Sequence, residues 1–220
     1  MAKISNPAFG VRGKALAIAL LLPLALLASR PAFAVDAEQA SALVRSAAAD
    51  TLAAFAGKKQ SPAQARAALH QIIGRYGDMN TESQHILGRY WTKANSDSQQ
   101  EFAALLERFV IASFGGMIDE IPAGQRIEVK GAEVQGDRVV VHSIASSPGE
   151  EPAALDWIVV DNAAGGRPVI VDLSVYGVAM VTTLKADFTS VIRSASGRLE
   201  ALFEPLRRKV SALGDTVSGS

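Results

Sequence analysis

The spacing of apolar residues changes twice along this chain, and these changes limit the folds it can adopt. Residues 36–116 carry apolar side chains at helical spacing, residues 126–176 at every second position, and residues 178–213 at helical spacing again. A period of 3.6 is typical of amphipathic helices, and a period of two is typical of half-buried strands. Helices, then a run of strands, then more helices indicate an α+β fold, because α/β folds alternate the two elements.

Four helices are expected before the strands. Ser61 and Pro62 are typical of an N-cap and a first helical position, and Gly77 is typical of a helix end. Ser96 and Gln99 have the spacing of a capping box. The helices are expected over residues 36–56, 62–76, 81–93 and 96–114.

Four strands and two further helices are expected after them. The turn at residues 135–137, Gln-Gly-Asp, favours a hairpin, and loops rich in Gly and Pro separate the later strands, so an antiparallel meander is the simplest topology. Pro205 should kink or restart the last helix. The expected strands cover residues 126–135, 138–146, 154–161 and 168–176, and the expected helices cover residues 178–195 and 198–213.

The first 34 residues have the pattern of a signal peptide. Three cations precede an uncharged apolar run over residues 15–28, and Ala32–Ala34 reads Ala-Phe-Ala. A membrane anchor is the alternative, but the run is shorter than the roughly 20 residues that a spanning helix needs. We expect cleavage after Ala34, a single domain over residues 35–213 and a disordered polar tail over residues 214–220.

The composition narrows the function classes. The leader holds four of the 22 basic residues and none of the 22 acidic ones, so the mature chain carries a formal charge of −4. A net acidic chain is a poor match for nucleic acid, whose phosphates are neutralised by Lys and Arg. The chain has no cysteine, so it forms no disulfide and carries no thiol for a lipid anchor. We therefore expect a soluble product in the periplasm.

Motifs for common catalytic chemistry are missing from the sequence. It has no Gly-x-Ser-x-Gly elbow, no phosphate-binding Gly-rich loop and no His-Glu-x-x-His. His70, His85 and His142 are scattered, so we expect no metal site and no cofactor. Asp156 and Asp172 on interior strands are the best candidates for a general base, although an alternating strand is also expected to have one polar face.

Five short segments occur in a characteristic order along the chain: LGRYW (87–91), QQEF (99–102), LDW (155–157), VDLSVYGVAMV (171–181) and F..VI....G.L..L (188–202). Together they resemble the MlaC/toluene-tolerance family of periplasmic phospholipid-transport proteins. Three features depart from the family pattern: residues 183–185, where the family usually shows an aromatic residue and an Arg, Pro205 in the last helix, and the segment IASFGG (111–116). A branch of the family is associated with hopanoid biosynthesis.

The resemblance implies a function and a set of partners. The protein would be a non-enzymatic, monomeric shuttle that carries phospholipid between an outer-membrane lipoprotein complex and an inner-membrane ABC transporter with its tethered lipid-binding subunit. It would thereby maintain the lipid asymmetry of the outer membrane. The fold would be α+β, with N-terminal helices, a four-stranded, antiparallel, curved, NTF2-like sheet and C-terminal helices enclosing an apolar cavity.

The candidate lipid-binding residues lie on apolar faces that could line such a cavity. Periodicity alone cannot distinguish these faces from a packed core, so the assignment rests on the resemblance. The alternatives are a hopanoid-related carrier, a small-molecule isomerase with Asp172 or Asp156 as base, and an adaptor that makes only protein contacts. The candidate residues are Leu106, Phe109, Val141, Trp157, Leu173, Val175, Val178, Val181, Leu184 and Phe188.

Overall fold

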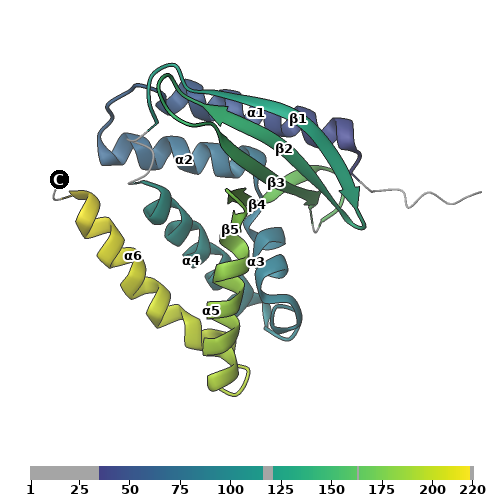
Figure 1. Cartoon of the computed structure of the whole chain (residues 1–220). Coiled ribbons are helices and arrows are strands. Elements are labelled where there is room, and N and C mark those ends of the chain that lie inside the picture. The colour runs from purple at the N-terminus through teal and green to yellow at the C-terminus, as the bar shows by residue number, and fades with distance from the viewer. Residues whose placement is uncertain (1–34, 116–120, 163, 219–220) are drawn as a thin grey trace, which may run out of the picture. The chain divides into compact units, whose positions relative to one another are not determined.

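The computed structural model describes residues 35–115, 121–162 and 164–218 of the chain (Figure 1). All of them belong to one compact unit, Phe33–Ser220. The expected signal peptide and the last two residues of the expected tail lie outside the described residues. Within the described ranges, no helix is long and apolar enough to cross a bilayer.

An antiparallel meander forms the sheet, as the sequence predicts. The strands are β1 Arg126–Gln135, β2 Arg138–Ser146, β3 Ala153–Asp161, β4 Pro168–Val175 and β5 Val178–Ala179, and they pair in that order. The expected count of four strands was wrong, because the sheet has a fifth strand, the two-residue β5. It pairs with the end of β4 across a turn at Tyr176 and Gly177. Both turn residues have positive φ, and a tight two-residue hairpin turn requires this conformation.

A bulge in β4 divides its apolar residues between the two faces of the sheet. Ile158 of β3 pairs with Asp172, but Val159 pairs with Ile170, so Val171 is an extra residue. Ile170 and Leu173, three positions apart, consequently share one face. The strict alternation that the sequence indicates over Val169–Val175 is therefore wrong at this point, because the register shifts by one residue.

The N-terminal helices begin largely where their caps predict. The helices are α1 Ala37–Phe55, α2 Pro62–Tyr76, α3 Met79–Leu87 and α4 Ser96–Gly115. Ser61 and Gln64 form a capping box at α2. The capping box expected at Ser96 was wrong: the Oδ1 of Asn95 accepts the bond from the Ser98 N–H, at 2.8 Å.

The helices on either side of the sheet segment differ from expectation at their ends. Helix α3 stops at Gly88, which has φ of 52°, and a short 3-10 turn follows over Gly88–Tyr90. The last elements are α5 Met180–Ser194, a 3-10 turn over Leu199–Leu202, and α6 Phe203–Ser218, which runs beyond the expected end at residue 213. Pro205 lies in the first turn of α6, so the helix restarts there, as expected.

The two largest of the four apolar clusters among the described residues hold most of these elements together. In the first, α1 lies against the sheet (Figure 1). There Val44 packs with Val139, Val141 and Val159, and all four are fully buried. The second joins α3, α4, α5 and α6. In it, the rings of Phe102 and Phe188 meet edge to face with centroids 5.9 Å apart. The region between the two clusters is where the candidate site lies.

Candidate functional site

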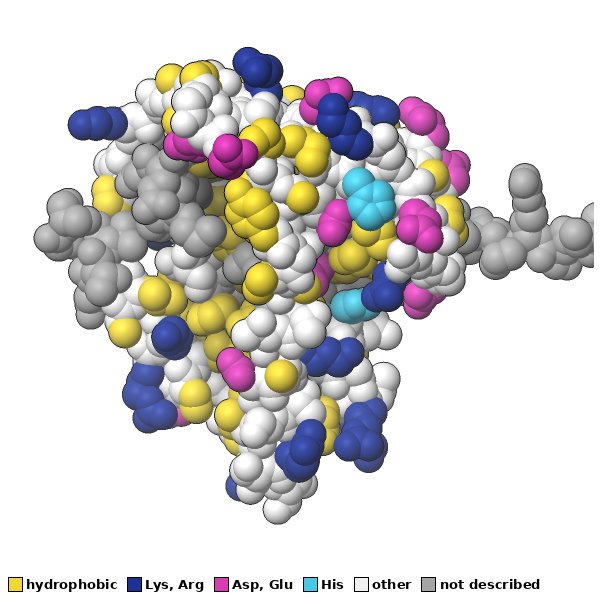
Figure 2. Space-filling model, in the orientation of Figure 1, with side chains coloured by type: hydrophobic (Ala, Val, Ile, Leu, Met, Phe, Trp, Pro, Cys, Tyr) yellow, Lys and Arg dark blue, Asp and Glu magenta, His cyan; other side chains and the backbone are white. Residues whose placement is uncertain are grey.

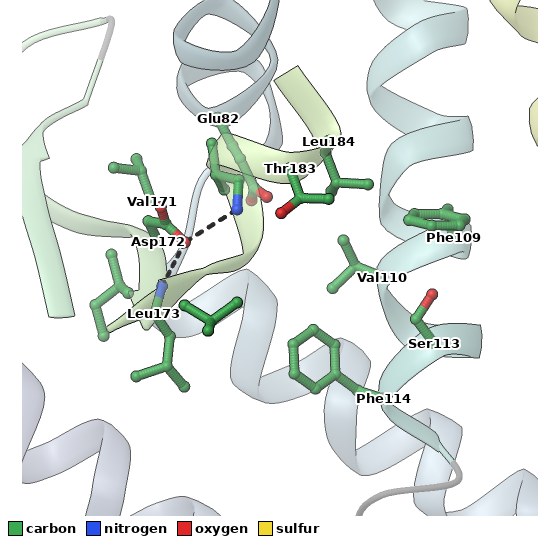
Figure 3. A pocket seen from close by; sticks show the side chains of 13 residues that line it. Glu82, Phe109, Val110, Ser113, Phe114, Val171, Asp172, Leu173, Thr183 and Leu184 are labelled. Atoms are coloured by element: carbon green, nitrogen blue, oxygen red, sulfur yellow. Dashed lines mark hydrogen bonds between the residues drawn. The ribbon is translucent and has the colours of Figure 1, made fainter. Parts of the chain in front are cut away.

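A pocket of about 380 Å³ lies between α3, α4, β4 and the start of α5 (Figure 3). Side chains of β4 face those of α4 across the pocket. Figure 2 shows hydrophobic side chains near the centre of the molecular surface in view, between the strands and helices α5 and α6. The pocket is partly open rather than enclosed. Its lining residues are Glu82, Phe109, Val110, Ser113, Phe114, Ile170, Val171, Asp172, Leu173, Val178, Val181, Thr183 and Leu184.

A second pocket of about 200 Å³ adjoins the first. It lies among α1, α2, α3, α4 and the sheet, and it shares Glu82, Val110, Phe114 and Ile170 with the first pocket. A ligand that filled both would therefore pass these four side chains. The remaining lining residues of the second pocket are Ala47, Thr51, Leu69, Ile72, Ile73, Tyr76, Gly77, Met79 and Trp157.

The pockets include some of the residues expected from the sequence and leave out others. Five of the ten candidates line the first pocket, namely Phe109, Leu173, Val178, Val181 and Leu184, and Trp157 lines the second. The residues that line neither are Leu106, Val141, Val175 and Phe188. Leu106 and Phe188 belong to the helical cluster, and Val141 and Val175 to the cluster under α1. Lipid binding by any of the ten stays a prediction.

Exposure separates the rim of the first pocket from its walls. Val178 is 67% exposed and Thr183 is also exposed, whereas Val181 is buried. The first pocket therefore opens at β5 and the start of α5. The second pocket is lined by none of these residues, so it extends away from that opening.

Sequence reasoning missed several lining residues. Val110 and Ser113 lie on the same helical stripe as Phe109, so a signal for them existed, but it does not distinguish a pocket wall from a core. Ile170 was missed because of the bulge in β4. Glu82 gave no signal, since a charged residue on an amphipathic helix is expected to face water.

Asp172 is held by backbone amides. Its Oδ1 accepts hydrogen bonds from the Leu173 N–H, at 2.8 Å, and from the Val181 N–H, at 3.2 Å (Figure 3). The N-cap residue of α5, Ala179, makes no side-chain bond, so Asp172 supplies the cap from β4. Capping of α5 is thus a structural reason for an Asp at position 172, and it requires no catalytic role.

Asp156, the other candidate base, lies away from the pockets. Its Oδ1 is 2.6 Å from Nδ1 of His142 on the adjacent strand, and both side chains are roughly half exposed. It lines neither pocket. Among the residues that the structure describes, no group of three His, Asp or Glu side chains could hold a metal ion.

Trp157 is fixed in place by a polar contact. Its indole N–H donates to Oγ of Ser143, at 2.8 Å, and both residues are buried. The bond satisfies the only polar atom of the indole and leaves the ring to contribute apolar surface.

Glu82 is the charged residue that both pockets share. It is only 9% exposed, and none of the side-chain hydrogen bonds among the described residues involves its carboxyl. Burial, and secondarily the negative charge of Asp172, raise the pKa of Glu82 to about 8. At neutral pH the side chain is therefore mostly a neutral carboxylic acid.

Comparison with known proteins identifies the family of this chain and a similar solved structure. The model of the MlaC protein family matches residues 45–208 of the chain. A solved structure of a phospholipid-binding protein from Ralstonia solanacearum, in complex with a phospholipid, is similar to this chain. It is 25% identical with a TM-score of 0.67, and the match covers 80% of this chain and 99% of that one. No curated protein matches the chain.

Proposed function

Starting from the fact that this chain belongs to the MlaC family, we propose that it binds phospholipid and carries it as a transport protein. The observation that carries the proposal is the pair of adjoining pockets between the sheet and the helices. The similar protein from Ralstonia solanacearum, which is described as phospholipid-binding, supports the same ligand class.

The walls suit acyl chains. They are formed mainly by Val, Leu, Ile and Phe side chains, and the larger volume of about 380 Å³ lies within the usual range of small-molecule sites. Burial contributes about 0.8 kcal/mol per methylene, so roughly sixteen methylenes contribute about 13 kcal/mol before the costs of binding. Apolar burial is therefore sufficient to hold the lipid.

The head group would stay at the opening of the first pocket. Val178 and Thr183 mark this rim, and both are exposed. A charged phosphate left there keeps its hydration, whereas burying it in the apolar walls would carry a large desolvation cost. The acyl chains would enter past Val181 and Leu184.

We further propose that the protein acts in the periplasm, between an outer-membrane lipoprotein complex and an inner-membrane ABC transporter with its lipid-binding subunit. Family membership and the signal-like leader support this placement. Such a carrier needs no chemical step, in keeping with the use of Asp172 as a helix cap. Its role would be to maintain the lipid asymmetry of the outer membrane.

Mass spectrometry of an organic extract tests the proposal. Protein purified without detergent should yield phospholipid at a stoichiometric level. A triterpenoid in its place would indicate a hopanoid-related carrier. Absence of any lipid, together with failure of delipidated protein to bind added phospholipid, would contradict the proposal.

A further inference from the structure

We propose that Glu82 is a hydrogen-bonding site inside the pockets that selects lipids with a hydroxyl group on the buried part of a chain. The inference rests on the proposed function, since it concerns which lipid is preferred. Binding of a lipid by apolar burial alone would not require a polar residue at this position.

The position of Glu82 places it against the middle of any ligand that spans the two pockets. The residue lines both of them, and its carboxyl points into the first (Figure 3). The other three shared side chains, Val110, Phe114 and Ile170, are apolar. A chain that reaches from the rim at Val178 into the second pocket therefore passes the carboxyl of Glu82 beside these three apolar side chains.

The carboxyl of Glu82 is left unpaired by the described protein residues. Asp172, the charged residue that affects it electrostatically, has its Oδ1 engaged by two backbone amides. The raised pKa of Glu82 makes its side chain a neutral acid at neutral pH, and such a group offers one O–H donor and a carbonyl acceptor. A ligand hydroxyl can accept from the first and donate to the second.

Two kinds of lipid chain would be treated differently. An all-hydrocarbon chain excludes water from Glu82 without replacing its hydrogen bonds, and leaving a buried polar group unsatisfied is costly. A chain with a hydroxyl at the right depth restores those bonds. The ester groups of a phospholipid do not fill this role, because they lie next to the head group, at the rim.

Matched phospholipids test the inference. We would compare phosphatidylethanolamine carrying a stearoyl chain with the same lipid carrying a hydroxystearoyl chain, with the hydroxyl near the ester, near the middle or near the end. Competition against a fluorescent phosphatidylethanolamine on delipidated protein gives each Kd. At least one hydroxylated lipid should bind about tenfold more tightly than the parent lipid.

Variants assign that preference to Glu82. Glu82→Leu should abolish the preference, while Glu82→Gln should keep it, because an amide also donates and accepts. Glu107→Gln is the matched control: Glu107 contacts His70 on α2, lines neither pocket and should leave every Kd unchanged.

The outcomes separate this inference from the proposed function. Equal Kd values for the parent and all hydroxylated lipids would overturn the role of Glu82 and leave lipid binding intact. A preference that survives in Glu82→Leu would overturn it as well. Failure of the wild type to bind any of the lipids would overturn both.

Discussion

The side chain of Asp172 in β4 caps helix α5, because its Oδ1 accepts a hydrogen bond from the Val181 N–H at 3.2 Å. The same oxygen accepts the N–H of Leu173 at 2.8 Å. One carboxylate thus joins the strand that forms one wall of the first pocket to the helix that forms part of its rim. The geometry of the opening depends on this connection.

Replacing Asp172 with Ala should destabilise the protein by about 1 kcal/mol, the usual effect of losing a helix cap. Asp172→Asn should retain much of this stability, since the amide oxygen can accept the same bonds. Urea denaturation of both variants measures the difference. Asp187→Ala, at an exposed position on α5, is the control and should have little effect.

Asp172→Asn also tests the isomerase alternative, because an amide cannot act as a base. A carrier with this substitution should bind lipid about as well as the wild type. Loss of function in cells without loss of stability or of lipid would count against the carrier.

Filling the first pocket should reduce lipid retention. Leu184→Trp places a large side chain where an acyl chain would lie, whereas Thr182→Trp adds the same group at an exposed position of α5. We expect both variants to fold and only Leu184→Trp to be purified with little lipid, as measured by mass spectrometry of the extract. Equal lipid content in the two would exclude an acyl chain from this site.

Val175→Trp provides the comparison with a packed region. Val175 lines neither pocket and packs against the cluster under α1. Overpacking there should cost about 1–3 kcal/mol of stability. Leu184→Trp should cost less, because the pocket has room for part of the ring.

The raised pKa of Glu82 predicts a pH-dependent stability. An unfolded Glu ionises near 4.5, whereas Glu82 ionises at about 8 in the folded chain, so between these values only the folded state holds the proton. Raising the pH through this window therefore destabilises the wild type, by an amount of the order of 5 kcal/mol, and the loss levels off above about pH 8. Glu82→Gln should lack this decline.

Urea unfolding of wild type and Glu82→Gln at about pH 5, 7 and 9 tests the prediction. The stability of the variant relative to the wild type should rise along this series. His85 on α3, whose pKa is lowered chiefly by burial, is present in both proteins, so its contribution cancels in the difference. Parallel pH profiles would show that Glu82 is ionised in the folded protein.

Removing the lipid should lower the melting temperature. A ligand that binds only the folded state contributes RT ln(1 + [L]/Kd), about 4 kcal/mol at a thousandfold excess over Kd. Delipidated protein should melt at a lower temperature and recover when phospholipid is returned. Glu82→Leu is expected to show this recovery with the unmodified lipid, and identical melting of the two wild-type forms would argue against a deep acyl site.

Processing after Ala34 would create a charged contact at the start of the domain. The backbone N–H of Val35 donates to Oδ2 of Asp161 at 3.1 Å, and Val35 is buried. Cleavage would turn that N–H into an ammonium group facing a carboxylate. N-terminal sequencing of the exported protein should begin at Val35, and Asp161→Asn should lower the melting temperature of the processed form more than that of the precursor.

The sequence predicted the elements better than the site, for identifiable reasons. Ser61 and Pro62 are adjacent in the chain, so the start of α2 could be predicted from the local sequence, and Ser61 is its N-cap in the structure. Whether a side chain lines a pocket depends on the packing of distant elements. Leu106 and Phe109 lie on one helical stripe, yet Leu106 is fully buried among helices and Phe109 borders the pocket.

Long-range polar contacts could not be predicted from the sequence either. The cap of α5 comes from Asp172, nine positions before Val181, on another element. The burial of Glu82 depends on α3 meeting both α4 and β4. No local sequence pattern indicates such contacts between distant elements, because periodicity describes one element at a time.

The bulge at Val171 makes one wall of the pocket depend on the number of residues in β4 as well as on their kind. Ile170 and Leu173 face the pocket together only because one residue is left out of the ladder between them. An extra residue between Ile158 and Val159 of β3 would give Val171 a partner and restore strict alternation in β4, which would turn Ile170 and Leu173 to opposite faces of the sheet. During divergence, this pair of strands should therefore accept exchanges among Val, Ile and Leu far more readily than a change of length.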